Sequence, residues 1–140
     1  MRVSCQTAGL NSKPTHIMKN NAINWFEIFV ADLSRARTFY ETILNAKLQD
    51  SGMDCCEMAI FPYDNMQGIG GALTKMEGYN PGPGGSMVYL NVEGDLDAVL
   101  SRISAAGGKV IRDRFAIPPH GFIGILEDTE GNVVGLHSMV

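Results

Sequence analysis

The 140-residue chain contains no run of apolar residues long enough to cross a bilayer as a helix, which takes roughly 18–20 of them. It also has no block of like charge, because 11 Lys and Arg against 15 Asp and Glu give a net charge of only −4. We therefore expect neither a membrane nor a nucleic acid as a partner. With 45% apolar and 19% charged residues, the chain is too apolar to be disordered and is expected to be one soluble domain.

Cysteine is scarce, and three of them, an odd number, do not make the disulfide framework of a secreted protein. Cys55 and Cys56 are adjacent, and neighbours on a strand point to opposite faces, so they are poor candidates for pairing with each other. Cys5 lies far upstream, and no Cys-x-x-Cys spacing indicates a zinc site. Reduced thiols and a cytoplasmic location are the prediction.

Two segments lack the periodicity of a helix or a strand. Residues 1–21 contain polar residues that interrupt any signal-peptide core, so we expect a flexible leader before a single domain at 22–139. Residues 77–85 read EGYNPGPGG, and four glycines and two prolines in nine residues predict a connector. A linker is the first interpretation of this connector, and a mobile lid is the second.

The two halves on either side of the connector repeat one order of elements, strand–helix–strand–strand–strand. The predicted strands of the first half are 23–30, 47–50, 55–61 and 69–76, and those of the second are 86–92, 109–112, 122–127 and 132–139. Asp32 and Asp95 are expected to begin the two helices, and Asn45 to end the first. The halves align at an offset of 62–63 residues, with Val30 on Val92. We therefore predict two modules, 22–76 and 86–139.

Three segments carry a resemblance to a known family. They are FEIFVADLSRARTFY at 26–40, GGKV at 107–110 and EDTEGNVVGLH at 127–137. In this order, around a repeated βαβββ unit, they resemble the vicinal oxygen chelate superfamily, also called the glyoxalase/bleomycin-resistance/dioxygenase group. The resemblance implies an α+β fold in which two βαβββ modules in tandem form a cupped mixed sheet, usually in a homodimer.

The metal-dependent members of that family hold a divalent cation in the cup with up to four His, Glu or Gln ligands. At the four matching positions this chain has Trp25, Ala72, Met87 and Gly135. These side chains cannot form a hard-cation site. We therefore predict a cup without the family metal and without a cofactor.

Because side chains alternate along a strand, the residues that share a face with these four positions can be read from the sequence. The residues expected to bind a ligand are Trp25, Phe29, Thr74, Met87 and Tyr89. Glu27 and His137 are the candidates for acid–base catalysis. Each of these side chains is also open to a purely structural interpretation, as core filler or as a satisfied polar group. His120, in a loop, is expected to be solvated.

Three functions remain open at this point. The first is a glyoxalase-related protein that binds a small organic molecule in the cup, lactoylglutathione-lyase-related at best, with lyase or isomerase chemistry by Glu27 and His137. The second resembles the bleomycin-resistance members, which sequester a planar or cationic small molecule without catalysis. The third is a ligand-sensing module. The sequence predicts the family and the pocket and leaves catalysis open.

Overall fold

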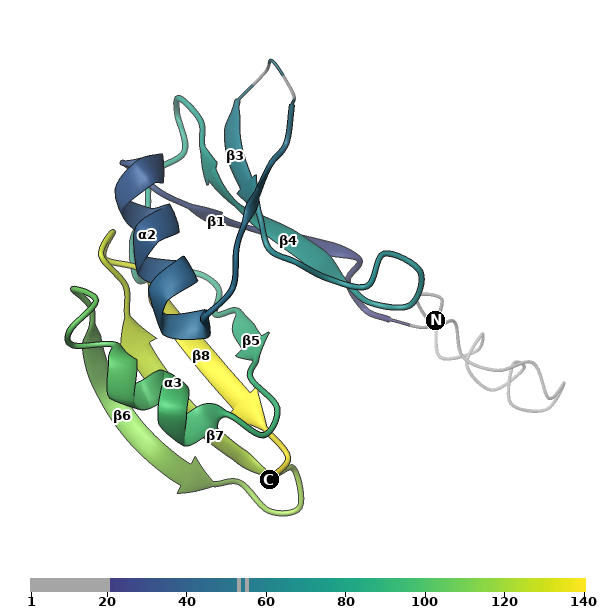
Figure 1. Cartoon of the computed structure of the whole chain (residues 1–140), viewed down its shortest axis with the longest axis vertical. Coiled ribbons are helices and arrows are strands. Elements are labelled where there is room, and N and C mark those ends of the chain that lie inside the picture. The colour runs from purple at the N-terminus through teal and green to yellow at the C-terminus, as the bar shows by residue number, and fades with distance from the viewer. Residues whose placement is uncertain (1–20, 53, 55) are drawn as a thin grey trace, which may run out of the picture.

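The computed structural model of the chain describes residues 21–52, 54 and 56–140. Each half forms a βαβββ module, as predicted, with a four-stranded sheet of its own (Figure 1). Module one contains β1 (Trp25–Phe29), α2 (Leu33–Leu44), β2 (Gln49–Asp50), β3 (Glu57–Ile60) and β4 (Gly70–Lys75). Module two contains β5 (Tyr89–Asn91), α3 (Leu96–Arg102), β6 (Lys109–Ala116), β7 (Phe122–Glu127) and β8 (Val133–Ser138). The predicted leader lies outside the described residues except for Asn21.

The two sheets repeat one strand order, β1-β4-β3-β2 and β5-β8-β7-β6. In each sheet the first and last strands of the module run parallel, and the other pairs are antiparallel. β1 and β5 are therefore the matching edge strands of the two sheets. The α+β class and the tandem modules expected from the sequence are confirmed.

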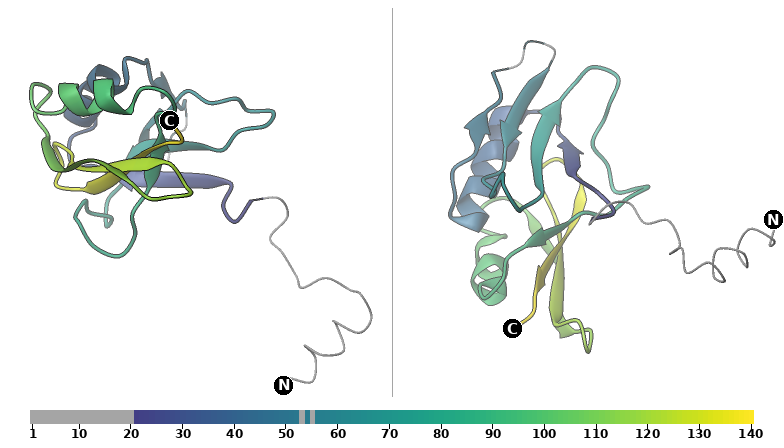
Figure 2. Two further views of the ribbon diagram at one scale, coloured as in Figure 1. Left: turned by 90° about the horizontal axis from the view of Figure 1, so that it is seen from below. Right: turned by 90° about the vertical axis from the view of Figure 1, so that its right-hand side faces the viewer.

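The two helices contact each other and lie on the same side of the sheets (Figures 1 and 2). The core lies between these helices and the sheet faces that they cover. It includes Ile28 and Val30 at β1, and Leu90 and Val92 at β5. No helix among the described residues covers the opposite faces of the two sheets. No helix in the part of the chain that the structure describes is both long and apolar enough to span a bilayer.

Helix α2 begins and ends as its sequence predicts. Asp32 accepts a 3.0 Å hydrogen bond from the backbone N–H of Arg35, and Asn45 ends the helix in the left-handed conformation at φ 53°. Helix α3 differs, because Asp95 takes the position before its first turn but its side chain makes no capping hydrogen bond. The Asp95 carboxylate instead forms an ion pair of 3.4 Å with Arg102 in the last turn.

The turn between β7 and β8 connects module two to the start of α2. The Glu130 carboxylate has no exposed surface and accepts 3.0 Å hydrogen bonds from the backbone N–H groups of Ala31 and Asp32. It also accepts two hydrogen bonds from the Arg35 guanidinium, at 2.7 and 2.9 Å. Burial alone would raise the pKa of Glu130, but hydrogen bonds from Arg35 and the two N–H groups outweigh it and lower the pKa to about 2.

Three further side chains join the modules, and two of them, Tyr40 and Asn132, also bind Asp128. The hydroxyl of Tyr40 on α2 donates to Asp128 Oδ2 at 2.7 Å, and burial together with this carboxylate raises the pKa of Tyr40 well above its ordinary value. Asn132 Nδ2 donates to the Phe29 carbonyl oxygen at 2.8 Å. At the other end of α2, Arg102 Nε donates to the Ile43 carbonyl oxygen at 2.9 Å. The closing motif of the sequence therefore has a structural role at the junction of the modules.

Candidate functional site

The uncovered face of β1 carries three of the predicted site residues. Ile28 is buried in the core beneath the helices, so Trp25, Glu27 and Phe29 lie on the opposite face, and all three are half-buried. In the parallel register with β4, Glu27 lies beside Ala72 and Phe29 beside Thr74. The alternation read from the sequence therefore matches the strand as folded.

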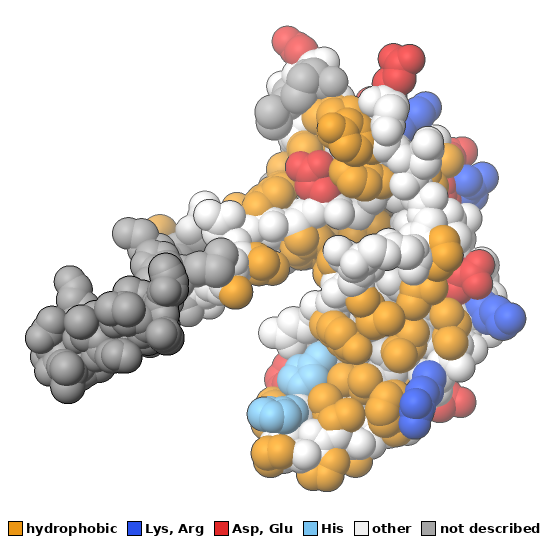
Figure 3. All heavy atoms as spheres, turned by 180° about the vertical axis from the view of Figure 1, so that it is seen from behind, with side chains coloured by type: hydrophobic (Ala, Val, Ile, Leu, Met, Phe, Trp, Pro, Cys, Tyr) orange, Lys and Arg blue, Asp and Glu red, His pale blue; other side chains and the backbone are white. Residues whose placement is uncertain are grey.

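A groove of about 920 Å³ lies between the edge strands β1 and β5. Both modules line it, and its lining includes Trp25, Glu27, Tyr63, Met87, Tyr89 and Asn91. Figure 3 shows the recess between the modules, with hydrophobic side chains on both of its sides. A concave, mainly apolar groove with a few polar groups is typical of a small-molecule site.

Three side chains of module one form a connected cluster in this groove. The Trp25 indole Nε1 donates to Glu27 Oε2 at 3.3 Å, which is a long hydrogen bond. The Tyr63 ring contacts Trp25 edge to face, with 6.1 Å between the centroids and 74° between the planes. The cluster presents aromatic surface around one carboxylate.

Tyr89 forms the opposite wall of the groove. Its ring lies over Gly135 on β8, where an added Cβ atom would lie 2.3 Å from the ring. Tyr89 is 48% exposed, so the ring is held from one side only. The space that a side chain at position 135 would need is thus occupied by a phenol ring that faces the groove.

The residues at the four family ligand positions do not fit a divalent cation. Trp25, Ala72, Met87 and Gly135 offer no carboxylate, imidazole or amide donor, and these are the groups that bind such metals. Within residues 21–52, 54 and 56–140, no three His, Cys, Asp or Glu side chains gather so as to hold a metal ion. The metal-free cup stays a prediction that rests on the chemistry of these donors.

Glu27 and His137, the two catalytic candidates, have different partners. His137 Nε2 lies 2.7 Å from the His120 carbonyl oxygen, an arrangement in which the ring N–H donates. His137 is not among the described residues that line the groove, whereas Glu27 is. The structure therefore does not bring the two side chains together as a hydrogen-bonded pair.

Thr74 and Phe29 lie at the end of β1 and β4 away from Trp25. The Thr74 hydroxyl is completely buried and has no hydrogen-bond partner among the described residues. The Phe29 ring stacks on Tyr79 of the connector, with 5.1 Å between the centroids. The connector thus packs against the uncovered face of module one at this end.

Tyr63 and Tyr79 were not predicted from the sequence as site residues. Tyr63 follows β3, and Tyr79 lies within the Gly- and Pro-rich connector. A large aromatic residue in such a polar or Gly-rich segment is the one local signal that could have indicated them, because an aromatic ring is normally placed where it can pack.

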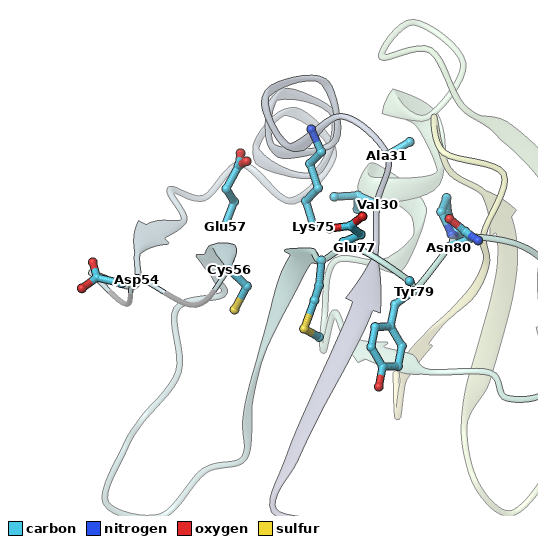
Figure 4. A pocket seen from close by; sticks show the side chains of 12 residues that line it. Val30, Ala31, Asp54, Cys56, Glu57, Lys75, Glu77, Tyr79 and Asn80 are labelled. Carbon is cyan, nitrogen blue, oxygen red and sulfur yellow. The ribbon is translucent and has the colours of Figure 1, made fainter.

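A second cavity, of about 830 Å³, lies beside the connector. Figure 4 shows that Glu57 and Lys75 point to one side there, while Cys56 and Tyr79 point to the other. These side chains do not converge on a common centre. The groove between β1 and β5 is therefore the stronger candidate site.

Comparison with known proteins places this geometry in context. The family model for the Glyoxalase/Bleomycin resistance protein/Dioxygenase superfamily matches residues 22–136. No curated protein matches the chain at a significant level.

Several solved structures share the fold. A glyoxalase/bleomycin resistance protein from Albidiferax ferrireducens T118 superimposes with a TM-score of 0.66 at 16% identity, covering 84% of this chain and 98% of that one. A glyoxalase-related enzyme from Fulvimarina pelagi gives 0.61 at 20% identity, covering 84% and 88%. The fosfomycin resistance protein FosX from Listeria monocytogenes gives 0.62 at 17% identity, covering 84% and 90%. At these identities the likeness shows the fold, and the activity has to be argued from the site.

Proposed function

The chain belongs to the glyoxalase/bleomycin resistance protein/dioxygenase superfamily, and we propose that it binds a small organic molecule in the groove between β1 and β5. The observation that carries this proposal is the groove itself, with a volume of about 920 Å³ and aromatic side chains from both modules. That volume lies within the range of about 300–1,000 Å³ that is usual for small-molecule sites.

Trp25 and Tyr89 are the principal contacts in this proposal. The indole offers a flat apolar face from module one, and the half-exposed phenol ring offers a second from module two. Such rings contribute contact area at little entropic cost, since each has only two side-chain torsions to fix. Met87, also half-exposed, adds an adaptable apolar surface beside them. Phe29 and Thr74, which the sequence also predicted as contacts, are not among the described residues that line this groove.

The proposal does not include the family metal. Two of the four ligand positions hold Trp25 and Met87, whose apolar side chains line the groove. The other two hold Ala72 and Gly135. Binding by shape, stacking and a single carboxylate needs no metal, whereas chelation of a substrate by a divalent cation needs donors that these positions do not supply.

The test combines metal analysis with ligand screening on the purified protein. Trp25 is the one tryptophan of the chain, so its emission reports directly on the groove. A ligand found by thermal shift is expected to change that emission, and Tyr89→Ala is expected to weaken its binding at least tenfold. Ile111→Ala, which removes an exposed apolar side chain outside the groove, is the matched control. A stoichiometric divalent metal that the ligand requires for binding, or a stabilising ligand without effect on Trp25, would contradict the proposal.

A second candidate function is lyase or isomerase chemistry with Glu27 as the base. It is favoured by the position of the Glu27 carboxylate inside the groove, within reach of a bound molecule. His137 would then act as the acid only after leaving the His120 carbonyl oxygen. Glu27→Gln is expected to abolish turnover of a substrate and preserve its binding if this chemistry occurs. A catalytic rate that survives the substitution would exclude Glu27 as the base.

We further propose that the protein forms a homodimer. Apolar side chains at the end of module two, those of Met139 and Val140, are exposed in the single chain. A second copy of the chain is the expected partner, because covering such a surface removes apolar area from water. Light scattering at micromolar concentration should give twice the mass of the chain, and a purely monomeric solution would contradict this proposal.

A further inference from the structure

A smaller cavity, here called the connector cavity, lies next to the groove and against the connector of residues 77–85. It has a volume of about 290 Å³ and is lined by the connector, by β1 and by the start of β8. Glu27, Ser86 and Val88 line both this cavity and the groove, so the two spaces adjoin. Figure 2 shows the connector on the side of the sheets away from the helices, where it forms one wall of the cavity.

Tyr79 and Gly82 attach the connector to the two modules. The Tyr79 ring stacks on Phe29 of module one, with 5.1 Å between the centroids and 26° between the planes, and Tyr79 remains 53% exposed. The backbone N–H of Gly82 donates to Asn132 Oδ1 of module two at 2.8 Å. A ring stack and a hydrogen bond between neutral groups each contribute little net stability. A bound molecule can therefore displace both contacts at a modest cost.

Glycines near both ends of the connector give its backbone freedom to move. Gly78 and Gly85 have φ of 91° and 88°, in the left-handed region that glycine enters without strain. A Cβ atom added at either position would meet no other atom within 4 Å, so the backbone is not tightly packed there. Small residues at the ends of a loosely packed segment are typical of hinges.

A hydrogen-bonding group without a partner lies close to the ring stack. Thr74 pairs with Phe29 in the register of β4 and β1. Its hydroxyl is completely buried and has no hydrogen-bond partner in the part of the chain that the structure describes. Leaving such a group unpaired costs free energy, which a hydrogen bond to a ligand would offset. Of the described residues that line the connector cavity, Glu27 alone carries a charged side chain, so the space suits a neutral group.

We propose that the connector is a gate, and that its opening joins the connector cavity and the groove into one elongated ligand site. When the ring stack and the Gly82 hydrogen bond separate, the site extends along β1 from Trp25 to Phe29 and Thr74. Trp25 and Phe29 are four residues apart, which corresponds to about 13 Å along a strand. The gate also accounts for the position of Phe29 and Thr74 outside the groove lining while it is closed.

The ligand of the open site is an elongated, mainly apolar molecule. Its wider end lies between Trp25 and Tyr89, and a neutral hydrogen-bonding group at its other end, such as an alcohol or a carbonyl, bonds to the Thr74 hydroxyl. This inference rests on the proposed function, since it assumes that the groove binds a small molecule. It adds the shape of that molecule, the group at its far end and the segment that admits it.

The test uses two probes that differ in length, 2-phenylethanol and 8-phenyloctan-1-ol. Binding is followed by calorimetry and by Trp25 emission, and opening of the gate by the hydrogen exchange of the Gly82 amide in NMR spectra. The long probe is expected to accelerate exchange at Gly82 at least threefold, because it displaces the connector, whereas the short probe is not. The amide of Leu136, in the core strand β8, should be accelerated by neither probe.

Variants of Tyr79 test the ring stack as the contact that keeps the gate closed. Tyr79→Ala removes the ring, so the open form becomes more populated and the affinity for the long probe rises with that population. We expect the affinity for the long probe relative to the short one to rise at least threefold. Tyr79→Phe keeps the ring and is the matched control, with an unchanged ratio.

A variant of Thr74 tests the hydrogen bond at the far end of the site. Thr74→Val is expected to weaken binding of the long alcohol at least threefold. Thr38→Val, which makes the same change at an exposed position of α2, should leave it unchanged. The exchange of the Gly82 amide in the unaltered protein gives an answer even if one of the variants folds poorly.

The outcomes separate this inference from the proposed function. A Gly82 amide that responds alike to both probes, or a ratio of affinities that Tyr79→Ala leaves unchanged, would overturn the gate. The groove with a fixed connector would then remain, provided that the short probe changes Trp25 emission. Failure of both probes to bind would overturn the proposed function, and this inference with it.

Discussion

The ring of Tyr89 lies directly over Gly135 on the neighbouring strand, so close that a Cβ atom at Gly135 would lie 2.3 Å from it. In module one, the same close approach joins Phe26 and Gly71, where the corresponding distance is also 2.3 Å. The two contacts differ in their surroundings, because Phe26 packs against the core whereas Tyr89 is half-exposed. This difference decides what a methyl group would do at each glycine.

Gly71→Ala is expected to lower the free energy of unfolding by about 1–3 kcal/mol, because the Phe26 ring packs against the core and stacks on Phe61, and both contacts would be disturbed. Gly135→Ala is expected to cost less than about 1 kcal/mol, since Tyr89 can turn toward solvent. It should weaken ligand binding in the groove, because the Tyr89 wall moves. Urea denaturation of both variants measures the difference. Equal losses of stability would contradict this account.

Glu130→Gln is expected to lower the free energy of unfolding at pH 7 by about 1–3 kcal/mol, because a buried carboxylate that accepts several hydrogen bonds is replaced by a neutral amide. The pKa of Glu130 is lowered from 4.5 to about 2 in the folded protein, so its contribution is complete above pH 4.5. The contribution is lost as the pH falls from 4.5 toward about 2.

The stability difference between the unaltered protein and Glu130→Gln should therefore shrink with acid, as followed by urea unfolding between neutral pH and the lowest pH at which the protein stays folded. Glu57→Gln, at an exposed position, is the control and should show no such difference. A gap that stays constant or widens with acid would show that the Glu130 contacts contribute nothing through ionisation.

Tyr40→Phe is expected to destabilise the protein by about 1–3 kcal/mol, since it removes a buried hydroxyl that donates to Asp128 at 2.7 Å. Tyr63→Phe, which changes an exposed tyrosine, is the control. Thermal unfolding of both variants measures the effect. An unchanged melting temperature for Tyr40→Phe would mean that Asp128 is satisfied by its other donors alone.

Thr74→Val is expected to raise the free energy of unfolding by up to about 1 kcal/mol, because it replaces a buried hydroxyl without a partner by a methyl group of similar size. The same variant tests the sequence-based prediction that Thr74 binds the ligand. A loss of ligand affinity together with a gain in stability would support that prediction, and an unchanged affinity would restrict Thr74 to packing.

The fold could be predicted from the sequence because its signals are local. The alternation at Trp25–Phe29 gave the buried and open faces of β1, and Asp32 and Asn45 gave both ends of α2. Strand β6 was predicted to end at Arg112 but continues to Ala116, since irregular pairing with β7 carries it past an interrupted pattern.

The site was less predictable because its contacts join residues far apart in the sequence. Tyr63 reaches Trp25 and Tyr79 reaches Phe29 from loops, where no periodicity shows the direction of a side chain. The partner of His137 is a backbone oxygen in the loop that contains His120, and a sequence pattern does not indicate such a contact.

Module two forms hydrogen bonds at both ends of helix α2. The Glu130 carboxylate accepts from the Asp32 N–H at its start, and the Arg102 guanidinium donates to the Ile43 carbonyl oxygen in its last turn. The signs of these charges match the partial charges of the helix ends. Module one leaves the ribosome first, yet the groups that complete its helix are still unsynthesised at that moment. Module one therefore reaches its full stability only after module two has been synthesised. The two halves of the repeat share one topology, but the first depends on the second for the contacts at both ends of its helix.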